Sequence, residues 1–304
     1  MIAVIGSTNL DIVYGVDHLT APGETQTALN LNYHFGGKGA NQAVTAAKIS
    51  NQNILFSTSI GGDSEGKEVQ KRFKKLRIEG YHIHQKAKTG RAFIEVDKKG
   101  ENRIVIHPGA NDLHSPEFVV NFLEEYKEDI KYCLIQNEIP AKSVEKALEI
   151  LKLKNIKVMY DPAPKEKTEK DWLKGIDYLT PNETEFFYLK DKLNIKEENI
   201  EQEALIFKRK TGIKNLIIKR GSKDLIIINE DNEILIQKTF KTKVVDTTAA
   251  GDIFNAAFAC ALSQDNSLKD AVKYASAAAA VSVTKRGAQS SIPDTDEIKE
   301  LLSR

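Results

Sequence analysis

Hydrophobic positions along the chain follow two different periods. Short runs of apolar and β-branched residues predict buried strands, and longer segments with an apolar residue every third or fourth position predict amphipathic helices. Because the two kinds of segment alternate, the pattern predicts βαβ units that build a mainly parallel, Rossmann-like sheet flanked by helices. The predicted strands are Ile54–Ile60, Cys133–Gln136, Ile156–Tyr160 and Leu216–Ile218. The predicted helices are Ala40–Ile49, Lys67–Ile78, Ser115–Tyr126 and Ala141–Leu151.

Two segments, residues 10–35 and 90–108, break this alternation because they have the composition of strands without helices between them. In the second segment, Arg91–Asp97 and Asn102–Ile106 flank a polar, Gly-containing stretch that is typical of a turn, which predicts a β-hairpin. We expect the two segments to form one small antiparallel sheet that acts as a lid, although an edge extension of the main sheet would give the same pattern. The α/β core is then expected to contain residues 1–9, 36–89 and 109–304.

Composition and charge exclude several classes of protein. Among 304 residues, 44 Lys and Arg oppose 43 Asp and Glu, so the formal net charge is +1. This balance argues against a basic domain that coats nucleic acid, and a hydrophobic content of 41% argues against a disordered chain. Cys133 and Cys260 lie far apart without metal-ligand spacing, which favours a reducing, cytoplasmic location. No apolar run approaches the roughly 20 residues of a membrane span, so we expect no membrane partner.

The strongest chemical signal lies near the carboxyl end of the chain. A run with the texture of a strand, Lys241–Val245, precedes an Ala-rich helix that is predicted to begin near Ala250. The small residues from Ala249 to Gly251 leave backbone N–H groups uncovered at the helix N-terminus, where an anion is favoured. Asp252 then lies in the first turn, where its carboxylate can accept a proton from an attacking hydroxyl. Taken alone, Asp252 is equally well explained as a carboxylate that complements the helix dipole.

Three further groups of residues have the chemistry of a polar ligand site. The Gly-rich segment Gly36–Asn41 permits close backbone approach, and its Lys and Asn side chains offer hydrogen-bond donors. Asn9 and Asp11 fall on one side of a predicted strand, where they suit a vicinal diol. Glu138 follows a predicted strand, at the edge where open α/β sheets bind ligands. Each group alone could equally be a turn or a cap.

Two motifs, in order along the chain, resemble the two signatures of the ribokinase-like sugar kinase family. They are Gly36-Gly37-Lys38-Gly39-Ala40-Asn41 and Asp246-Thr247-Thr248-Ala249-Ala250-Gly251-Asp252. The likeness covers essentially the whole chain, including Thr180–Glu185, Lys219–Ser222 and Gly287–Gln289. The resemblance implies the family fold with its β-sheet lid, an ATP-dependent carbohydrate kinase activity, and a homodimer formed through the lid.

The resemblance also implies roles for individual residues. Asp252 is the implied catalytic base, and the backbone N–H groups of Ala249, Ala250 and Gly251 are the implied anion hole. The implied sugar-binding residues are Asn9, Asp11, Gly37, Lys38, Gly39, Asn41 and Glu138. The implied residues for ATP and its Mg²⁺ are Asn182, Glu185, Lys219, Arg220, Gly221, Ser222, Asp224, Gly251 and Ser276. The implied positions around a monovalent cation, usually K⁺, are Asp246, Thr248, Ser282, Lys285, Gly287 and Ser291, several through the backbone carbonyl alone.

Two positions depart from the commoner family pattern, and one feature bears on the substrate. Ala249 stands where Gly is commoner, which changes the anion-hole turn, and Ser276 stands where His is often found, which changes the nucleotide site. Asp11 and Glu138 face only Lys38 as a cation, which argues against a sugar that is already phosphorylated. Among unphosphorylated sugars, the resemblance implies phosphorylation of D-ribose at the 5-hydroxyl. The alternatives are a kinase of 2-deoxyribose, a ketohexose or adenosine, and a non-catalytic sugar-binding protein. An Ala-rich buried helix followed by a Gly turn would explain the region from Ser276 to Ser291 without a cation.

Overall fold

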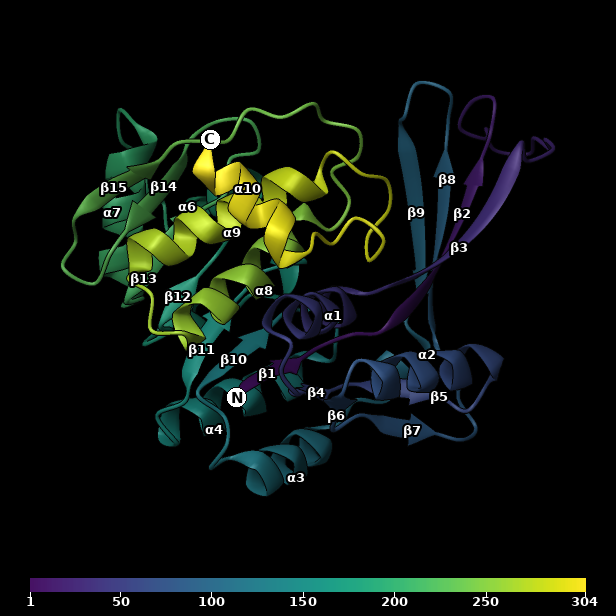
Figure 1. Ribbon diagram of the computed structural model, residues 1–304, viewed down its shortest axis with the longest axis horizontal. Coiled ribbons are helices and arrows are strands. Elements are labelled where there is room, and N and C mark those ends of the chain that lie inside the picture. The colour runs from purple at the N-terminus through teal and green to yellow at the C-terminus, as the bar shows by residue number, and fades with distance from the viewer.

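A nine-stranded sheet forms the centre of the computed structural model, which describes residues 1–304 (Figure 1). The pairings from β6 to β13 are all parallel, and the two pairings of β14 are antiparallel. The predicted α/β class with a mainly parallel central sheet is therefore confirmed. In sheet order the strands are β15 (Ile234–Gln237), β14 (Leu225–Ile228), β13 (Asn215–Ile218), β12 (Tyr178–Leu179), β11 (Lys157–Tyr160), β10 (Tyr132–Ile135), β1 (Ile2–Ile5), β4 (Ile54–Ser57) and β6 (Ile78–Glu79).

Helices cover both faces of this sheet, which explains why a central strand such as β1 is apolar at every position. In β1, Ile2 and Val4 pack into the core on one face, whereas Ala3 and Ile5 pack into the core on the other. The first face carries α1 (Lys38–Ser50), α2 (Ser64–Lys75), α8 (Ala250–Ser263), α9 (Leu268–Ser282) and α10 (Thr295–Ser303). The second carries α3 (Pro116–Tyr126), α4 (Ala141–Leu153), α5 (Lys170–Leu173), α6 (Glu183–Asp191) and α7 (Ile200–Thr211). None of these helices has the length and apolar character that crossing a membrane requires.

A four-stranded sheet projects from one side of the main body (Figure 1). Its order is β3 (Asn30–Gly36), β2 (Asn9–Gly15), β8 (Gly90–Val96) and β9 (Asn102–His107). The pairs β2–β3 and β8–β9 are antiparallel, and β8–β9 is the hairpin that the sequence predicted. β2 and β8 pair in parallel, so the expected antiparallel sheet contains one parallel pairing. One row across this sheet contains Tyr33, Ile12, Phe93 and Val105, so a line of large apolar side chains shares one face.

Two predicted elements have other bounds in the structure. The predicted strand Ile54–Ile60 is two strands, because β5 (Ser59–Gly61) leaves the main sheet and pairs with β7 (His82–His84). The predicted helix Lys67–Ile78 begins earlier and ends at Lys75, since Asp63 caps it through a hydrogen bond from the backbone N–H of Gly66. Two short 3₁₀ helices, η1 (Gly109–Leu113) and η2 (Lys165–Lys167), complete the elements.

The predicted strand at Lys241–Val245 is wrong: this segment is an extended loop. Its valines are not buried in a sheet, since Val244 is 58% exposed and Val245 is 48% exposed. The segment has no neighbouring strand to pair with, and the N–H of Val245 donates instead to the carbonyl of Val283 at the end of α9. β-branched residues indicate a strand only where a partner strand and a buried face are present.

The strand order determines where the polar loops meet. β1 lies between β4 and β10, so the chain builds the sheet outward from β1 in both directions. Parallel strands place their carboxyl ends at one edge, and ligands of open α/β sheets bind at the edge where the strand order reverses. The loops that follow β1, β10, β11, β12 and β13 therefore converge at this edge.

Candidate active site

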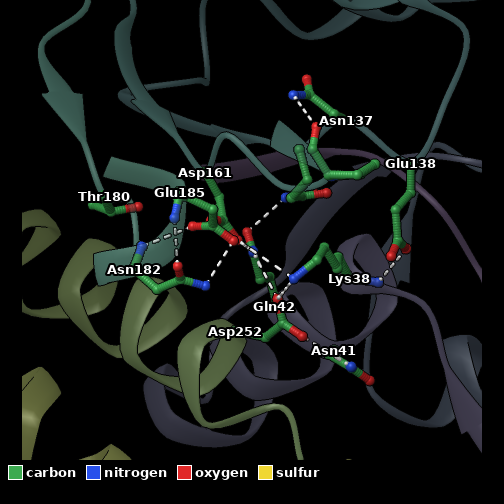
Figure 2. A network of polar contacts seen from close by, with 12 residues as sticks. Lys38, Asn41, Gln42, Asn137, Glu138, Asp161, Thr180, Asn182, Glu185 and Asp252 are labelled. Atoms are coloured by element: carbon green, nitrogen blue, oxygen red, sulfur yellow. Dashed lines mark hydrogen bonds and ion pairs between the residues drawn. The ribbon is translucent and has the colours of Figure 1, made fainter. Parts of the chain in front are cut away.

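Polar side chains follow the converging strands at this edge. Ser7 follows β1, Glu138 follows β10, Asp161 follows β11 directly, and Lys219 follows β13 directly. The N-terminal turns of α1 and α8 meet the same edge and contribute Lys38 and Asp252. Figure 2 shows the charged side chains of these loops and helices pointing toward one another.

Asp252 is an almost fully enclosed carboxylate, with 5% of its surface exposed. Its two oxygens accept hydrogen bonds from Nδ2 of Asn41 at 3.0 Å and from Nε2 of Gln42 at 3.1 Å (Figure 2). Burial raises the pKa of Asp252, and the positive charge of Lys38 opposes this rise. The two donors hold the carboxylate oxygens in one orientation, and burial strengthens the affinity of the carboxylate for a proton. A general base requires both properties.

Lys38 places its ammonium group between two carboxylates. Its Nζ lies 4.0 Å from Oδ2 of Asp161 and 4.0 Å from Oδ1 of Asp252 (Figure 2). Burial lowers the pKa of Lys38, but the nearby carboxylates, led by Asp252 and Asp161, outweigh this effect and raise the pKa above its usual range. Lys38 is therefore a permanent positive charge at the site. Its backbone N–H also donates to Oε2 of Glu138 at 3.0 Å.

Two glycines let α1 approach β1 closely. Gly37 is the N-cap of α1 with φ = 88°, and a Cβ there would lie 2.8 Å from the backbone nitrogen of Asn9. A Cβ on Gly39 would lie 2.6 Å from the carbonyl carbon of Gly6. Both contacts are too short for any side chain, so the Gly-rich segment brings the helix N-terminus against the strand end.

The N-terminus of α8 begins at a strained alanine. Ala249 is the N-cap with φ = 60°, in the left-handed region that L residues other than Gly rarely occupy. The N–H of Ala250 donates to the carbonyl of Thr247 at 3.2 Å, so it is already engaged within the turn. The N–H groups of Ala249 and Gly251 make no hydrogen bond within the protein. Two of the three N–H groups of the expected anion hole are therefore free to receive an anion.

Asn9 and Asp11, two of the sugar-binding residues expected from sequence, lie at the start of β2. Asn9 is buried, and its side-chain oxygen accepts a hydrogen bond from Nδ2 of Asn111 at 2.8 Å. Asp11 packs over Gly36, where any side chain would overlap its carboxylate. Burial, followed by the charges of Glu138 and Asp252, raises the pKa of Asp11 to about 7. The negative charges of Glu138 and Asp252 therefore act on Asp11 here.

A cavity of about 790 Å³ opens beside the first turn of α8. Its apolar part includes Leu225, Phe240, Val244 and Val283, and a volume of this size suits a nucleotide. The expected site residues that line it are Lys38, Asn182, Glu185, Lys219, Arg220, Gly221, Ser222, Ala249, Ala250, Gly251, Asp252 and Ser276. Asp224 does not line it, because its carboxylate accepts the N–H of Thr239 at 3.0 Å and holds the neighbouring loop.

Asn182 and Glu185 form a capping box at the start of α6. The side chain of Asn182 accepts the N–H of Glu185 at 2.8 Å, and the carboxylate of Glu185 accepts the N–H of Asn182 at 2.7 Å. Burial and the charge of Asp161 raise the pKa of Glu185, while Lys219 opposes the rise. Capping accounts for the pair structurally. The two side chains nevertheless line the cavity, where a crowded carboxylate can receive a cation.

The expected cation positions lie in two loops that Asp246 joins. Its carboxylate accepts the N–H of Thr248 at 2.9 Å and the N–H of Gly287 at 2.8 Å. The backbone carbonyls of Asp246, Thr248, Lys285 and Gly287 accept no hydrogen bond within the protein. The hydroxyls of Ser282 and Ser291 donate to carbonyls of their own turns. The ammonium of Lys285 pairs with Glu297 and so faces away.

Sequence reasoning missed three contributors to the site. Asp161 directly follows a predicted strand, so the rule that singled out Glu138 could also have found it. Gln42 lies beside Asn41 in the Gly-rich motif, but nothing in the sequence shows that its amide reaches Asp252. The loop containing Phe240 and Val244 gave only the wrong signal of a strand, because its contact with the cavity depends on a turn that only the fold defines.

Known proteins resemble the chain over its full length. The model of the pfkB family carbohydrate kinases matches residues 1–295. Ribokinase of Haemophilus influenzae is 41% identical over 99% of this chain and 98% of its own, and deoxyribokinase of Salmonella typhimurium is 33% identical over 99% and 98%. The crystal structure of Thermotoga maritima ribokinase matches with a TM-score of 0.92 and 46% identity, covering 100% of this chain and 99% of that one. Arabidopsis thaliana ribokinase complexed with ribose and ATP matches with a TM-score of 0.87 and 30% identity, covering 100% and 98%.

Proposed function

The chain belongs to the pfkB family of carbohydrate kinases, and from this premise we propose that it transfers the γ-phosphoryl group of ATP to the 5-hydroxyl of D-ribose. The observation that carries the proposal is the position of Asp252. This buried carboxylate lies between a cavity of nucleotide size and a cluster of polar groups suited to a sugar. The products are D-ribose 5-phosphate and ADP. Ribokinases among the full-length relatives favour D-ribose over other sugars as the substrate to propose.

In the proposed reaction, Asp252 accepts the proton of the sugar hydroxyl as that oxygen forms a bond to the γ-phosphorus. The bond from phosphorus to the bridging oxygen breaks, and its electron pair leaves on ADP. The free N–H groups of Ala249 and Gly251, together with the dipole of α8, face the negative charge of the transferring group. Positioning and charge stabilisation provide most of the catalysis in phosphoryl transfer.

The sugar would bind among Asn9, Asp11, Lys38, Asn41 and Glu138, with the backbone of Gly37 and Gly39 forming the floor. Carboxylates accept hydrogen bonds from sugar hydroxyls, and the amides of the two asparagines can both donate and accept. The cluster of Asp11, Glu138 and Asp252 would repel a sugar phosphate. An unphosphorylated sugar is therefore the better substrate.

ATP would occupy the cavity with its phosphates toward α8. Glu185 offers hard oxygen ligands in the polar part, which fit a Mg²⁺ ion held by one carboxylate together with phosphates and water. No group of three or more His, Cys, Asp or Glu side chains is placed to hold a metal ion by itself. When bound, Mg²⁺ would neutralise charge on the phosphates. The adenine ring of ATP would rest near Phe240, Val244 and Ser276.

A monovalent cation fits the two loops joined by Asp246. The free carbonyls of Asp246, Thr248, Lys285 and Gly287 provide oxygen ligands, as K⁺ requires. Carbonyls of Ser282 and Ser291 would complete the set. A bound cation would fix the turn that presents Ala249 and Gly251.

We also propose that the four-stranded sheet acts as a lid over the sugar and forms a homodimer interface. Tyr33 is 60% exposed and Val105 is 62% exposed, and both lie in one row of apolar residues on the same face. Exposed apolar rows of this kind mark association surfaces. The proposed cytoplasmic location agrees with the two cysteines, which are buried and free.

An ATP-consumption assay across D-ribose, 2-deoxyribose, fructose, adenosine and fructose 6-phosphate tests this function. We expect the highest kcat/KM with D-ribose and the lowest with fructose 6-phosphate. A higher value with 2-deoxyribose would identify the second candidate, which the deoxyribokinase relatives support. The assignment would be overturned if ATP consumption with D-ribose were lower than with every other sugar.

A further inference from the structure

The position of Lys219 is fixed more closely than contact with a nucleotide alone would require. Its backbone N–H donates to the carbonyl of Pro181 at 2.9 Å, and the residue forms a parallel bridge with Asn182 beyond the ends of β12 and β13. Its side chain is 14% exposed and points into the cavity. A Cβ built on Gly251 would lie 3.4 Å from Nζ of Lys219. The ammonium group therefore lies directly against the first turn of α8.

The carboxylate of Asp161 lies between this ammonium group and the ammonium group of Lys38. Its Oδ1 lies 3.6 Å from Nζ of Lys219, and its Oδ2 lies 4.0 Å from Nζ of Lys38. Asp161 itself is buried, and Nε2 of Gln42 lies 3.4 Å from its Oδ2. The carboxylate of Asp161 thus lies between two ammonium groups. That of Lys38 lies near Asp252, and that of Lys219 lies near Gly251.

We propose that Lys219 is a second catalytic cation that contacts the γ-phosphoryl group during transfer, with Asp161 as its positioning residue. The proposal rests on the proposed kinase function and goes beyond the nucleotide-binding role expected for the turn. As the sugar oxygen bonds to phosphorus and the bond to ADP breaks, negative charge spreads over the three remaining oxygens of the phosphoryl group. The ammonium of Lys38 faces this group from beside Asp252, the base. The ammonium of Lys219 faces it from beside the free N–H of Gly251.

A different role for Lys219 would be to neutralise Asp161 and stabilise the fold. The two roles predict different results for substitution. A fold-stabilising lysine, when lost, lowers the melting temperature and weakens all ligands together. A catalytic cation, when lost, lowers kcat and the affinity for a transition-state analogue, while the affinities for D-ribose and ADP change little.

The test compares wild type with Lys219→Met, Lys219→Arg and the control Lys223→Met. Lys223 lies in the same turn, but its ammonium pairs with Glu183 at the surface and it does not line the cavity. We expect Lys219→Met to lower kcat by about 100-fold or more, which is typical for loss of one transition-state donor. Lys219→Arg should recover much of this loss, and Lys223→Met should match wild type. Binding of ADP with aluminium fluoride and D-ribose, measured by calorimetry, should weaken in parallel with kcat.

Several results would overturn the proposal. One is a kcat for Lys219→Met within about threefold of wild type. Another is an unchanged affinity for the aluminium fluoride complex, and a third is a loss that Lys219→Arg does not reverse. If Lys219→Met does not fold, as judged by circular dichroism, the comparison of Lys219→Arg with Asp161→Asn decides: we expect a reduced kcat with unchanged affinity for ADP in Asp161→Asn, and full activity there contradicts the proposal. Absence of ATP consumption by wild type with every sugar would instead overturn the proposed function, and this inference with it.

Discussion

The side-chain nitrogen of Gln42 lies 3.1 Å from Oδ1 of Asp252. The orientation of this amide is fixed, because its oxygen accepts a hydrogen bond from Nε2 of Gln136 at 2.6 Å. The donor therefore faces the carboxylate, where it stabilises the ionised form of Asp252.

Replacing Gln42 with Met should raise the pKa of Asp252 further, because one donor to the carboxylate is lost while burial is kept. A base must be deprotonated, so the acidic limb of the kcat profile should move to higher pH, with the largest loss at low pH. Steady-state kcat measured between about pH 5 and 9 checks this shift. Gln52→Met, at an exposed position, is the matched control. A uniform loss at every pH would show that Gln42 is only structural.

Asp252→Asn should fold and bind D-ribose but lose about 10²–10⁴-fold in kcat, because the amide cannot accept the hydroxyl proton. Asp296→Asn is a suitable control, since Asp296 is also a carboxylate in the first turn of a helix but is exposed. Melting curves and ribose titrations should accompany the kinetics. Turnover within a few-fold of wild type would remove Asp252 from the role of base.

The raised pKa of Asp11 makes both sugar binding and stability depend on pH. Its ordinary pKa is 3.8 and its pKa in the folded protein is about 7, so the folded state binds the proton more tightly than the unfolded state. Its contribution to stability is therefore present below pH 3.8 and is lost as the pH rises through about 7.

Asp11→Asn should remove this loss and raise the melting temperature of the ligand-free protein at about pH 8 more than at about pH 5. The same substitution should increase the KM for D-ribose, since the amide is a poorer acceptor for sugar hydroxyls. Thermal melts at the two pH values, with Asp97→Asn in the β8–β9 turn as control, check the effect. Equal shifts of the melting temperature at both pH values would contradict a raised pKa for Asp11.

Ala249→Gly should stabilise the protein by about 1 kcal/mol, because Ala249 has φ = 60° and Gly occupies this region without steric cost. The same exchange in the middle of α8, Ala256→Gly, should destabilise by about 1 kcal/mol or more through lost helix propensity and packing. Chemical denaturation of both variants measures the contrast. Destabilisation of the protein by both substitutions would show that the strain at Ala249 is not relieved.

Activity should be several-fold higher in potassium chloride than in tetramethylammonium chloride at the same ionic strength. The physical reason is the set of free carbonyls around Asp246, which a small monovalent cation can bind and a bulky one cannot. Initial rates in the two salts, at saturating ATP and Mg²⁺, measure the difference. Equal rates would remove the cation from the proposed site.

The candidate site could be predicted from sequence only where neighbouring residues form the local geometry. The turn from Ala249 to Asp252 and the capping pair of Asn182 and Glu185 are local, so their residue types reveal them. The contacts of Gln42 with Asp252 and of Asp161 with Lys219 join residues more than fifty positions apart. Hydrophobic periodicity and motif spacing describe neighbouring residues, so they do not predict contacts between residues so far apart in the sequence.

The sequence by itself determined the alternation of strands and helices, the separate β-sheet segments and the two glycine- and alanine-rich turns at helix N-termini. These features follow from side-chain burial and backbone freedom over a few residues. Only the tertiary structure decided that Lys241–Val245 is a loop and that Asp161 lies between Lys38 and Lys219. The reason is that parallel strands bring their carboxyl ends to one edge in an order that packing sets, so charges far apart in sequence become neighbours there.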